Sequence, residues 1–307
     1  MSTCAWMYHN GRIVPYEQAQ VHAFSGAVKY GAGVFEGLRG YWNEESGELW
    51  IFRLREHLER LRFGMRALRL DAVFETDELE RAMIALARAN ELRENTHFRM
   101  IAYIEGDDEL AGTGPVGLVA GAVKRPPSAR VETGIHVGIS SWQRIADNAL
   151  PPRVKCTANY INNRAAELEA RAAGYDGVLM LTADGKLSEG SGACLFLVRD
   201  GRLVTPDKGS DILESITRDT IMTLARDELG LEVVERRVDR TELLLAEEAF
   251  LCGSGQEVLP VISVARQAVG TGAPGPLTRA LQNAYFDLVC GRTAHHADWR
   301  TPVWGGR

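Results

Sequence analysis

The chain is organised around the sequence Arg153-Val154-Lys155-Cys156-Thr157-Ala158-Asn159-Tyr160, residues 153–160. A proline pair precedes it, and the apolar spacing after it predicts a helix over residues 161–173. The next run, 177–197, indicates two strands joined by the Gly/Ser-rich turn Leu187-Ser188-Glu189-Gly190-Ser191-Gly192. The sequence thus predicts an α/β unit with one lysine ahead of a helix and one glutamate in a turn.

A lysine and a glutamate in this arrangement suit an aldehyde cofactor that contains a pyridine ring. The amine of Lys155 would form a Schiff base with the aldehyde, and the carboxylate of Glu189 would keep the pyridine nitrogen protonated. A single lysine near a turn is, however, much more often a solvated surface charge. These two residues by themselves leave both interpretations open.

Length and composition set the outer limits. A chain of 307 residues more often forms two domains than one. Its 45% hydrophobic and 25% charged residues are those of an ordinary soluble globular protein. The net charge of -6 and the absence of a basic tract in the sequence give no electrostatic reason to expect nucleic acid or an acidic membrane surface as a partner.

Targeting and redox signals favour the cytoplasm. We expect no signal peptide, because no basic segment followed by an apolar stretch opens the sequence, and the apolar run 116–123 is too short to span a bilayer. The five cysteines are widely spread, odd in number and without metal-ligand spacing, which fits a reducing compartment. His295-His296 is interpreted as a polar tail, so no metal is expected.

The N-terminal half predicts strands and two amphipathic helices. Residues 6–14 indicate a hairpin that turns at Asn10-Gly11. Apolar residues recur at steps of three and four from Leu54 to Leu68, which is typical of a helix with one buried stripe. The further expected elements are strands over 41–52, 98–104 and 116–123, and a helix over 77–92 with Asp77 as its N-cap.

Two features of this half have both a structural and a functional interpretation. The segment 30–41 is rich in glycine but lacks the Lys-Ser/Thr ending of a P-loop, so a bend where backbones approach closely is the better interpretation. Arg60 lies beside the apolar stripe of its predicted helix. It is either a solvated side chain or an anchor for an anion at the edge of the core.

The C-terminal half offers two small-residue segments that could bind an anion. A polar loop over 212–219 enters a helix that runs to Leu229, and the amides at a helix start bind phosphate well. The alternative is an ordinary capping turn, because Ser215 and Thr217 are common capping types. The second segment, 253–257, follows a predicted strand over 248–252. A helix over 276–289 follows near the end of the chain.

The order and spacing of nine short segments resemble the class IV aminotransferases of pyridoxal phosphate fold type IV. The chain is most similar to the branched-chain amino acid aminotransferases, over nearly its whole length. The segments are FEGLRGY (35–41), REHLERL (55–61), SSWQR (140–144), KCTANY (155–160), GYDGVLML (174–181), LSEGSG (187–192), DGRLVTP (200–206), SITRD (215–219) and PGPLT (274–278).

This resemblance implies an α/β fold with mixed sheets in two domains and pyridoxal 5'-phosphate in the interdomain cleft. We expect a smaller N-terminal domain over 1–123, a linker over 124–132 and a larger cofactor-binding domain over 133–307. The implied reaction is ping-pong transamination between an L-amino acid, branched-chain or related, and a 2-oxo acid such as 2-oxoglutarate, in amino-acid biosynthesis. A homodimer or higher homo-oligomer is implied as well.

The resemblance also assigns roles to individual residues. Lys155 matches the Schiff-base lysine, which moves a proton between the substrate and the cofactor. The residues implied to bind the cofactor are Glu189 at the pyridine nitrogen, Tyr160 at the phenolic oxygen, and Arg60, Ile216, Thr217 and Ser254 at the phosphate. Those implied to bind the substrate are Tyr30, Phe35, Gly37, Arg39, His97, Arg99 and Gly255.

The sequence departs from the branched-chain pattern mainly where substrate binds. His97 stands where those enzymes usually have a tyrosine, Lys124-Arg125 replaces aromatic residues, and Ser254-Gly255 replaces a threonine-alanine pair. A more polar substrate site is therefore expected. The preferred amino donor then need not be valine, leucine or isoleucine.

Three alternatives remain open at the level of sequence. A D-amino acid aminotransferase shares the fold, but it lacks a match to FEGLRGY and to the tyrosine after the lysine segment. An aminodeoxychorismate lyase uses the same lysine for elimination. A non-catalytic binding protein on the same scaffold is the third, and the presence of Lys155, Tyr160, Glu189 and Arg60 argues against it.

Overall fold

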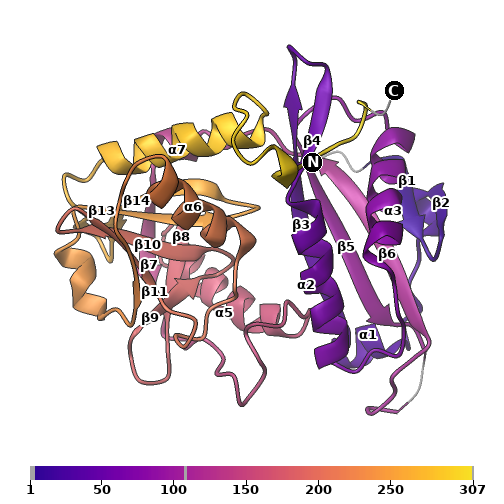
Figure 1. Cartoon of the computed structure of the whole chain (residues 1–307). Helices are drawn as coiled ribbons and strands as arrows, with labels where there is room; N and C mark the ends of the chain where they lie inside the picture. Colours follow the sequence, from indigo (N-terminus) through magenta and orange to yellow (C-terminus); the bar gives the residue numbers. More distant parts are fainter. Residues whose placement is uncertain (1–3, 107–108, 306–307) are drawn as a thin grey trace. The chain divides into compact units, whose positions relative to one another are not determined.

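The computed structural model describes residues 4–106 and 109–305, which divide into two compact units. Unit 1 comprises Met1–Pro126, Val154–Ala158 and Leu288–Arg307, and unit 2 comprises Pro127–Arg153 and Asn159–Asp287. Each unit contains one β-sheet with helices packed against it (Figure 1). The fold is therefore mixed α/β in two parts, and the predicted fold class is confirmed.

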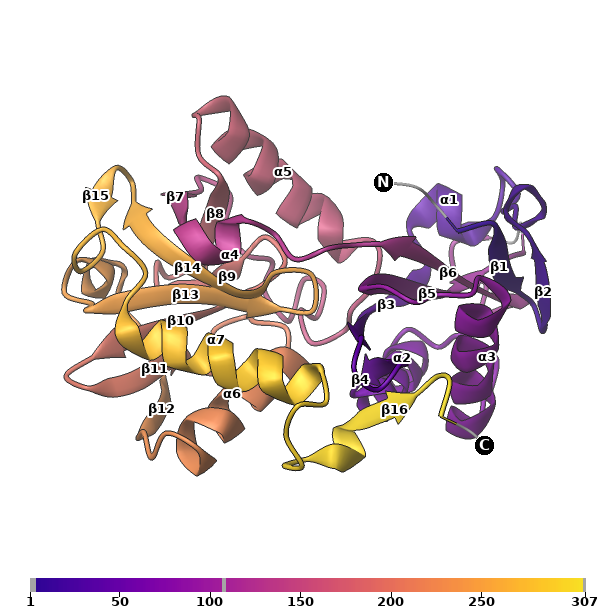
Figure 2. The ribbon, with the colours of Figure 1, turned by 90° about the horizontal axis from the view of Figure 1, so that it is seen from above.

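Unit 1 contains an antiparallel sheet of order β16-β4-β3-β5-β6-β1-β2. Helices α2 and α3 pack against each other and against this sheet (Figure 2). The elements are β1 Trp6–His9, β2 Arg12–Pro15, η1 Tyr16–Gln18, α1 Gly26–Tyr30, β3 Gly33–Asn43, β4 Glu48–Phe52, α2 Leu54–Ala67, α3 Thr76–Ala89, β5 Thr96–Ile104, β6 Val116–Lys124, η3 Ala297–Trp299 and β16 Arg300–Pro302.

Unit 2 contains a mixed sheet of order β12-β11-β10-β13-β14-β7-β8-β9, with β15 paired to β14. Its elements are α4 Arg130–Thr133, β7 Ile135–Ile139, α5 Asn159–Ala172, β8 Gly177–Leu181, β9 Leu187–Gly190, β10 Cys194–Arg199, β11 Arg202–Pro206, α6 Ile216–Asp227, β12 Val233–Arg236, η2 Arg240–Leu244, β13 Glu248–Gly253, β14 Glu257–Val264, β15 Gln267–Ala268 and α7 Pro276–Val289, whose last two residues group with unit 1.

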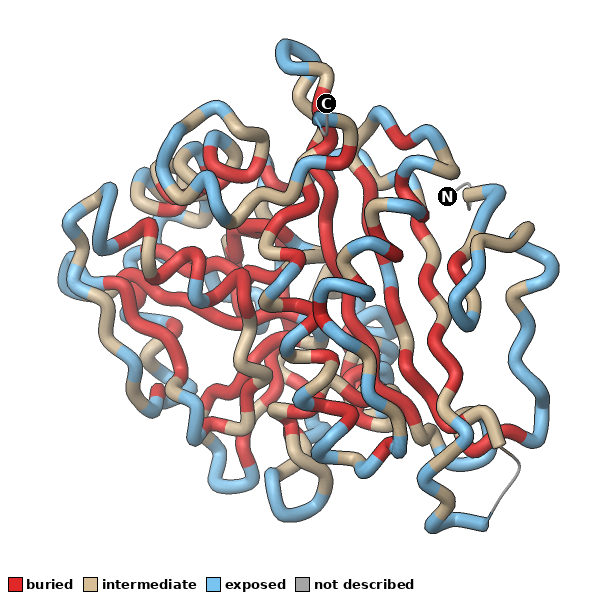
Figure 3. The backbone as a smooth tube through the Cα atoms, turned by 45° about the vertical axis from the view of Figure 1, so that its right-hand side comes forward, coloured by how far each residue is buried: buried red, intermediate tan, exposed pale blue. Residues whose placement is uncertain are grey.

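Several predicted elements are confirmed because their sequence signals are local. Asn10 and Gly11 both have positive φ, at 45° and 87°, as a two-residue hairpin turn requires. The predicted stripe of α2 is buried at Leu54, Leu58 and Leu61. Figure 3 shows the same pattern along the strands, where buried backbone alternates with exposed connecting loops.

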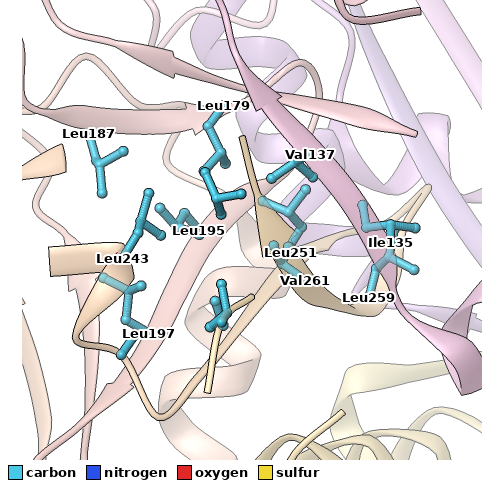
Figure 4. Close-up of a cluster of buried hydrophobic side chains, with 14 of the residues drawn as sticks. Ile135, Val137, Leu179, Leu187, Leu195, Leu197, Leu243, Leu251, Leu259 and Val261 are labelled. Carbon is cyan, nitrogen blue, oxygen red and sulfur yellow. The ribbon is translucent and has the colours of Figure 1, made fainter. Parts of the chain in front are cut away.

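The core of unit 2 is an aliphatic cluster contributed by neighbouring strands. Its side chains interdigitate around Val137, Leu179, Leu195, Leu251 and Val261, each at most 4% exposed (Figure 4). On general area arguments, full burial of one such side chain stabilises a fold by about 1.5 to 3 kcal/mol. This cluster provides a rigid base for the loops and helix termini at the edges of the sheet.

Most of the glycine-rich segment 30–41 belongs to a strand that begins at Gly33, and its interpretation as a bend was wrong for that part. Residues from Gly33 to Asn43 form β3, the central partner of β4 and β5. The close approach expected there is real, because a Cβ atom on Gly40 would lie 2.9 Å from Phe98 and 3.1 Å from Leu49. The glycines therefore allow tight packing between strands that are otherwise apolar and β-forming.

Three smaller predictions also need correction. Glu189 lies in strand β9 and not in a turn, because it pairs with Cys194 of β10. The expected strand 41–52 is broken by a turn, in which the side chain of Asn43 accepts hydrogen bonds from the amides of Glu45 and Ser46. Helix α3 begins at Thr76, so Asp77 lies in its first turn and is not the N-cap.

The two units divide the chain differently from the expected domain ranges at two places. Residues 154–158 and 288–307 group with unit 1, although both fall within the expected range 133–307. The first segment pairs with β3, and the second contributes β16, which pairs with β4. Such pairing joins residues far apart in sequence, and it therefore leaves no periodic signal in either segment.

Helix α7 starts against a buried carboxylate. Glu248 accepts hydrogen bonds from the amides of Leu277 and Thr278, at 2.9 and 2.7 Å, and from the Thr278 hydroxyl at 2.6 Å. These amides belong to the first turn of the helix, where no intrahelical acceptor exists. The PGPLT segment is thus explained as a helix start.

Among the described residues, no helix is both long and apolar enough to cross a membrane.

We predict that Gly275→Ala destabilises unit 2. A Cβ atom there would lie 2.1 Å from Cδ of Glu248, whose carboxylate cannot move without losing its bonds to α7. We expect the free energy of unfolding to fall by about 1 to 3 kcal/mol. Each kcal/mol lowers the midpoint of thermal unfolding by roughly 2 to 4 °C. The control is Gly209→Ala, where the nearest atom is 3.4 Å away. Equal midpoints for the two variants would contradict this account.

Candidate functional site

Lys155 is held against the central strand of unit 1 by backbone pairing. The amide of Phe35 donates to the carbonyl of Lys155 at 2.9 Å, and the amide of Thr157 donates to the carbonyl of Gly33 at 2.9 Å. The Thr157 hydroxyl also donates to the carbonyl of Gly31 at 2.6 Å. The lysine therefore extends from a backbone that is fixed on both sides.

The amine of Lys155 lies over an aromatic ring. Its Nζ is 4.8 Å from the centroid of the Phe35 ring, and Cζ of Arg99 is 5.6 Å from the same centroid. Phe35 is 9% exposed, so its ring is a largely desolvated surface for both cations. Such cation–π contacts are worth about 0.5 to 2 kcal/mol, which is enough to orient a flexible lysine side chain.

Five predicted substrate residues share one face of the unit 1 sheet. Strand register places Gly37 opposite Arg99 and Arg39 opposite His97. Directly paired residues point to the same side of a sheet, as do residues two apart along a strand, so Phe35 lies on this side too. We call Phe35, Gly37, Arg39, His97 and Arg99 the cationic face. Tyr30 lies at the end of α1, with 45% of its side chain exposed.

His97 is a neutral group among cations. Burial lowers the pKa of His97 to about 3, with further contributions from Arg99, Arg125, Arg39 and Lys155. Its Nδ1 is buried, with no hydrogen-bond partner in the described part of the protein. A Cβ atom on Gly37 would lie 3.2 Å from Nε2 of His97, so glycine leaves room for the ring. A neutral imidazole can donate one hydrogen bond and accept another.

The opposite face of β3 contacts helix α2 through Glu36. Its carboxylate accepts hydrogen bonds from Nε and Nη2 of Arg60 at 2.7 and 2.8 Å, and it lies 2.7 Å from Nδ1 of His57. Burial alone would raise the pKa of Glu36, but the charge of Arg60 and the bonds from Arg60 and His57 lower it to about 2. Arg60 is therefore neither solvated nor isolated.

In unit 2, Glu189 is a buried carboxylate with fixed partners. Nε of Arg144 donates to Oε1 at 2.9 Å, and the amide of Leu213 donates to Oε2 at 3.1 Å. The side chains of Arg144 and Glu189 are 3% and 4% exposed. A buried pair of this kind persists only when both charges are hydrogen-bonded. The carboxylate thus has a defined position, with hydrogen bonds donated by Arg144, the Leu213 amide and the Cys194 thiol.

The start of α6 carries the residues that are predicted from the sequence to bind phosphate. Ser215 caps the helix by accepting from the amide of Arg218, and Ile216 and Thr217 are the first helical residues. Their amides lie at the positive end of the helix dipole. Arg218 is 2% exposed and anchors this turn through Thr205, Pro206 and Glu235.

The remaining predicted residues of unit 2 lie at the ends of other elements. Tyr160 is in the first turn of α5. Ser254 and Gly255 follow β13, in the turn that the amide of Gln256 closes by donating to Gly253 at 3.0 Å. In the C-terminal segment, His296 stacks on Trp299 with ring centroids 4.1 Å apart. Within residues 4–106 and 109–305, no group of three or more His, Cys, Asp or Glu residues could hold a metal ion.

Three residues that contact predicted site residues were not singled out from the sequence: Glu36, His57 and Arg144. All three lie inside quoted segments, FEGLRGY, REHLERL and SSWQR. One signal was available for Glu36, which interrupts an apolar strand, because a charge at a buried position needs a charged or hydrogen-bonded partner. The sequence does not say which partner, and here Arg60 is 24 residues away.

Comparisons with known proteins agree with this chemistry. The family described as amino-transferase class IV matches residues 33–264. A branched-chain-amino-acid aminotransferase of Salmonella typhimurium is 37% identical over 305 residues, which cover 97% of each chain. The structure of the branched-chain amino acid aminotransferase of Thermobaculum terrenum in PLP-form is 44% identical, with a TM-score of 0.92 and 99% of each chain covered.

A further solved structure carries a cofactor derivative. It is a T.th. branched-chain amino acid aminotransferase complexed with N-(5'-phosphopyridoxyl)-L-glutamate, which is 35% identical with a TM-score of 0.91 and covers 98% of this chain and 99% of that one. The family match takes in the described residues from β3 to β14, including Lys155 and Glu189. The chain belongs to the class IV aminotransferases, which use pyridoxal 5'-phosphate.

Proposed function

We propose that Lys155 is the catalytic residue of this aminotransferase and that its substrates are an L-amino acid, branched-chain or related, and a 2-oxo acid such as 2-oxoglutarate. The observation that carries the proposal is the fixed backbone of Lys155, bound to β3 by the amides of Phe35 and Thr157. An amine that transfers a proton must stay in one place through the reaction.

The described residues fit pyridoxal 5'-phosphate, feature by feature. Glu189 is buried, is held in place by hydrogen bonds from Arg144 and the Leu213 amide, and is suited to hold a proton at the pyridine nitrogen. The start of α6 has the amides and the dipole that a phosphate requires. The residues that would hold the cofactor are Lys155 at the aldehyde, Tyr160 at the phenolic oxygen, Glu189 at the nitrogen, and Arg60, Ile216, Thr217 and Ser254 at the phosphate.

When bound, pyridoxal 5'-phosphate supplies an electron sink for the negative charge left on the α-carbon of the amino acid. The protein contributes the proton transfer. Nζ of Lys155 would take the α-proton of the amino acid as a base and return a proton, as an acid, to the aldehyde carbon of the cofactor. In the second half-reaction the same amine would move a proton from that carbon to the α-carbon. Phe35 restricts this amine by the contact at 4.8 Å and keeps water from one side of it.

The cationic face supports carboxylate recognition. Arg39 and Arg99 provide two guanidinium groups on one side of the sheet, and Arg125 contributes to the positive potential around His97. Guanidinium binds carboxylates in a planar, bidentate way. We infer that the cationic face, together with Tyr30 and Gly255, binds the carboxylates of the amino acid and the 2-oxo acid. The glutamate adduct of the T.th. enzyme supports an acceptor of the 2-oxoglutarate type.

We further propose a homodimer in the cytoplasm that serves amino-acid biosynthesis. Phe24, Val28 and Tyr30 expose 65%, 60% and 45% of their surface around the short helix α1. Apolar side chains grouped in this way favour a protein interface. The five cysteines are dispersed and the described ones form no disulfide, which supports a reducing compartment.

We predict that Lys155→Ala abolishes half-transamination. The loss of the proton-transferring amine lowers the rate by about 10²- to 10⁴-fold or more. The measurement is the absorbance spectrum of the purified protein after each of a panel of L- and D-amino acids is added, with conversion of the long-wavelength cofactor band as the signal. The control is Lys208→Ala, whose amine pairs with Glu214 at the surface.

Full activity of Lys155→Ala would contradict the proposal. Conversion by D-amino acids only would favour a D-amino acid aminotransferase. Release of pyruvate without a 2-oxo acid acceptor would identify a lyase.

We predict that Arg144→Met impairs the reaction through Glu189. The variant removes the charged donor to Oε1 of the buried carboxylate and leaves the donors to Oε2, among them the Leu213 amide, in place. A displaced carboxylate lowers kcat by about 10²-fold. The ¹⁵N chemical shift of labelled cofactor reports whether its ring nitrogen stays protonated. Arg144→Lys, which keeps the charge, recovers part of the loss, and the exposed Arg171→Met is the control. An unchanged shift in Arg144→Met would exclude this role.

We predict that His97 broadens the choice of amino donor. Wild-type protein accepts polar or aromatic donors at rates comparable to those for valine, leucine and isoleucine. His97→Tyr, which restores the expected hydroxyl, shifts the ratio toward the branched donors by about 10-fold. Single-turnover rates over a donor panel measure this ratio, with the exposed His295→Tyr as control. Wild-type rates already much higher for the three branched donors would refute it.

A further inference from the structure

Glu36, His57 and Arg60 form a buried charge cluster on the helix-facing side of β3. Glu36 is 0% exposed, and the side chains of His57 and Arg60 are 3% and 13% exposed. No step in the general chemistry of transamination requires the side chain of Glu36 or His57. A charge cluster of this kind costs desolvation energy, so it needs a reason beyond packing a helix on a sheet.

The geometry of the cluster restrains Arg60 completely. Nε and Nη2 both donate to Glu36, which defines the plane of the guanidinium as well as its direction. Because the group is planar, its Nη1 edge must point away from the carboxylate. His57 restrains the carboxylate in turn. Glu36 is ionised and only accepts, so the bond from His57 is donated by Nδ1–H, and the other ring nitrogen is an acceptor.

The cluster lies within electrostatic reach of the catalytic lysine. Burial lowers the pKa of His57, and the positive charges of Arg60 and Lys155 lower it further, against an opposing effect of Glu36. The connection is also covalent and short, because Glu36 follows Phe35, whose amide binds the Lys155 carbonyl. The orientation of Arg60 is thus set in the same part of unit 1 that fixes Lys155.

We propose that Glu36 and His57 are positioning residues for the phosphate of the cofactor, because they hold the guanidinium of Arg60 in one orientation for binding it. This rests on the proposed role of Arg60. An unrestrained arginine would have to give up its rotamer freedom on binding, whereas the cluster orders it during folding. The carboxylate also repels a phosphate. The proposal therefore requires that the gain from orientation exceeds this repulsion.

The test compares two ligands that differ only in the phosphate. Purified protein is depleted of cofactor with an amino donor and inorganic phosphate, and the Kd values for pyridoxal 5'-phosphate and for pyridoxal are measured by absorbance. We expect Glu36→Gln to raise the Kd for pyridoxal 5'-phosphate by about 10- to 100-fold, which is the range for one charge-assisted contact. The Kd for pyridoxal should change by less than about twofold. The matched control is Glu59→Gln, on the same helix as His57 and Arg60, where Glu59 is 58% exposed.

Two further variants separate positioning from stability. In an Arg60→Met background, Glu36→Gln should add little to the loss, because the residue acts through Arg60. His57→Gln should give a smaller loss that is again confined to the phosphate ester, and it decides the question if Glu36→Gln does not fold.

Several outcomes would overturn the inference. Equal weakening of both ligands would assign the cluster to stability alone. Unchanged or tighter binding of the phosphate ester by Glu36→Gln would show that repulsion outweighs orientation. A wild-type protein that bound neither ligand would overturn the cofactor assignment together with the inference, whereas the first two outcomes leave that assignment intact.

Discussion

The pairing of residues 154–158 with β3 is the constraint on which the rest of the structure depends. Hydrogen bonds from Phe35 and Thr157 bring the chain back to unit 1 in the middle of the sequence that builds unit 2. Backbone pairing determines the position of a residue more tightly than side-chain contacts can. Lys155 is therefore as well placed as a residue of the central strand, although it lies in no regular element.

The alternation of side chains along β3 then separates two kinds of chemistry. One side of β3 carries the members of the cationic face on this strand, which are Phe35, Gly37 and Arg39. Glu36 lies on the other side, toward α2. One strand thus contributes to the substrate residues on one side and to the support of Arg60 on the other. A shift of register by one residue would exchange the two sets, so the tight glycine packing of this strand protects function as well as stability.

Three of the buried carboxylates in the structure accept hydrogen bonds from N–H donors. Glu36 binds Arg60 and His57, Glu189 binds Arg144 and a backbone amide, and Glu248 binds the start of α7. The common reason is the cost of an unpaired buried charge, which is several kcal/mol and exceeds any gain from packing. Directional hydrogen bonds in these clusters hold each side chain in a single orientation, whereas aliphatic packing would permit several. Two of the three hold residues proposed to bind the cofactor.

The sequence by itself determined the longer helices, most strands and, through its resemblance to a known family, the cofactor. Helix α2 and the Asn10-Gly11 hairpin were predictable, because periodicity and turn preferences are properties of short segments. Only the tertiary structure decided that residues 33–41 belong to a strand and that Lys155 belongs to unit 1. It also decided that Glu36, His57 and Arg144 contact predicted site residues. Each of these depends on a partner distant in the chain, and hydrogen bonds between distant residues follow from folding in three dimensions, not from local composition.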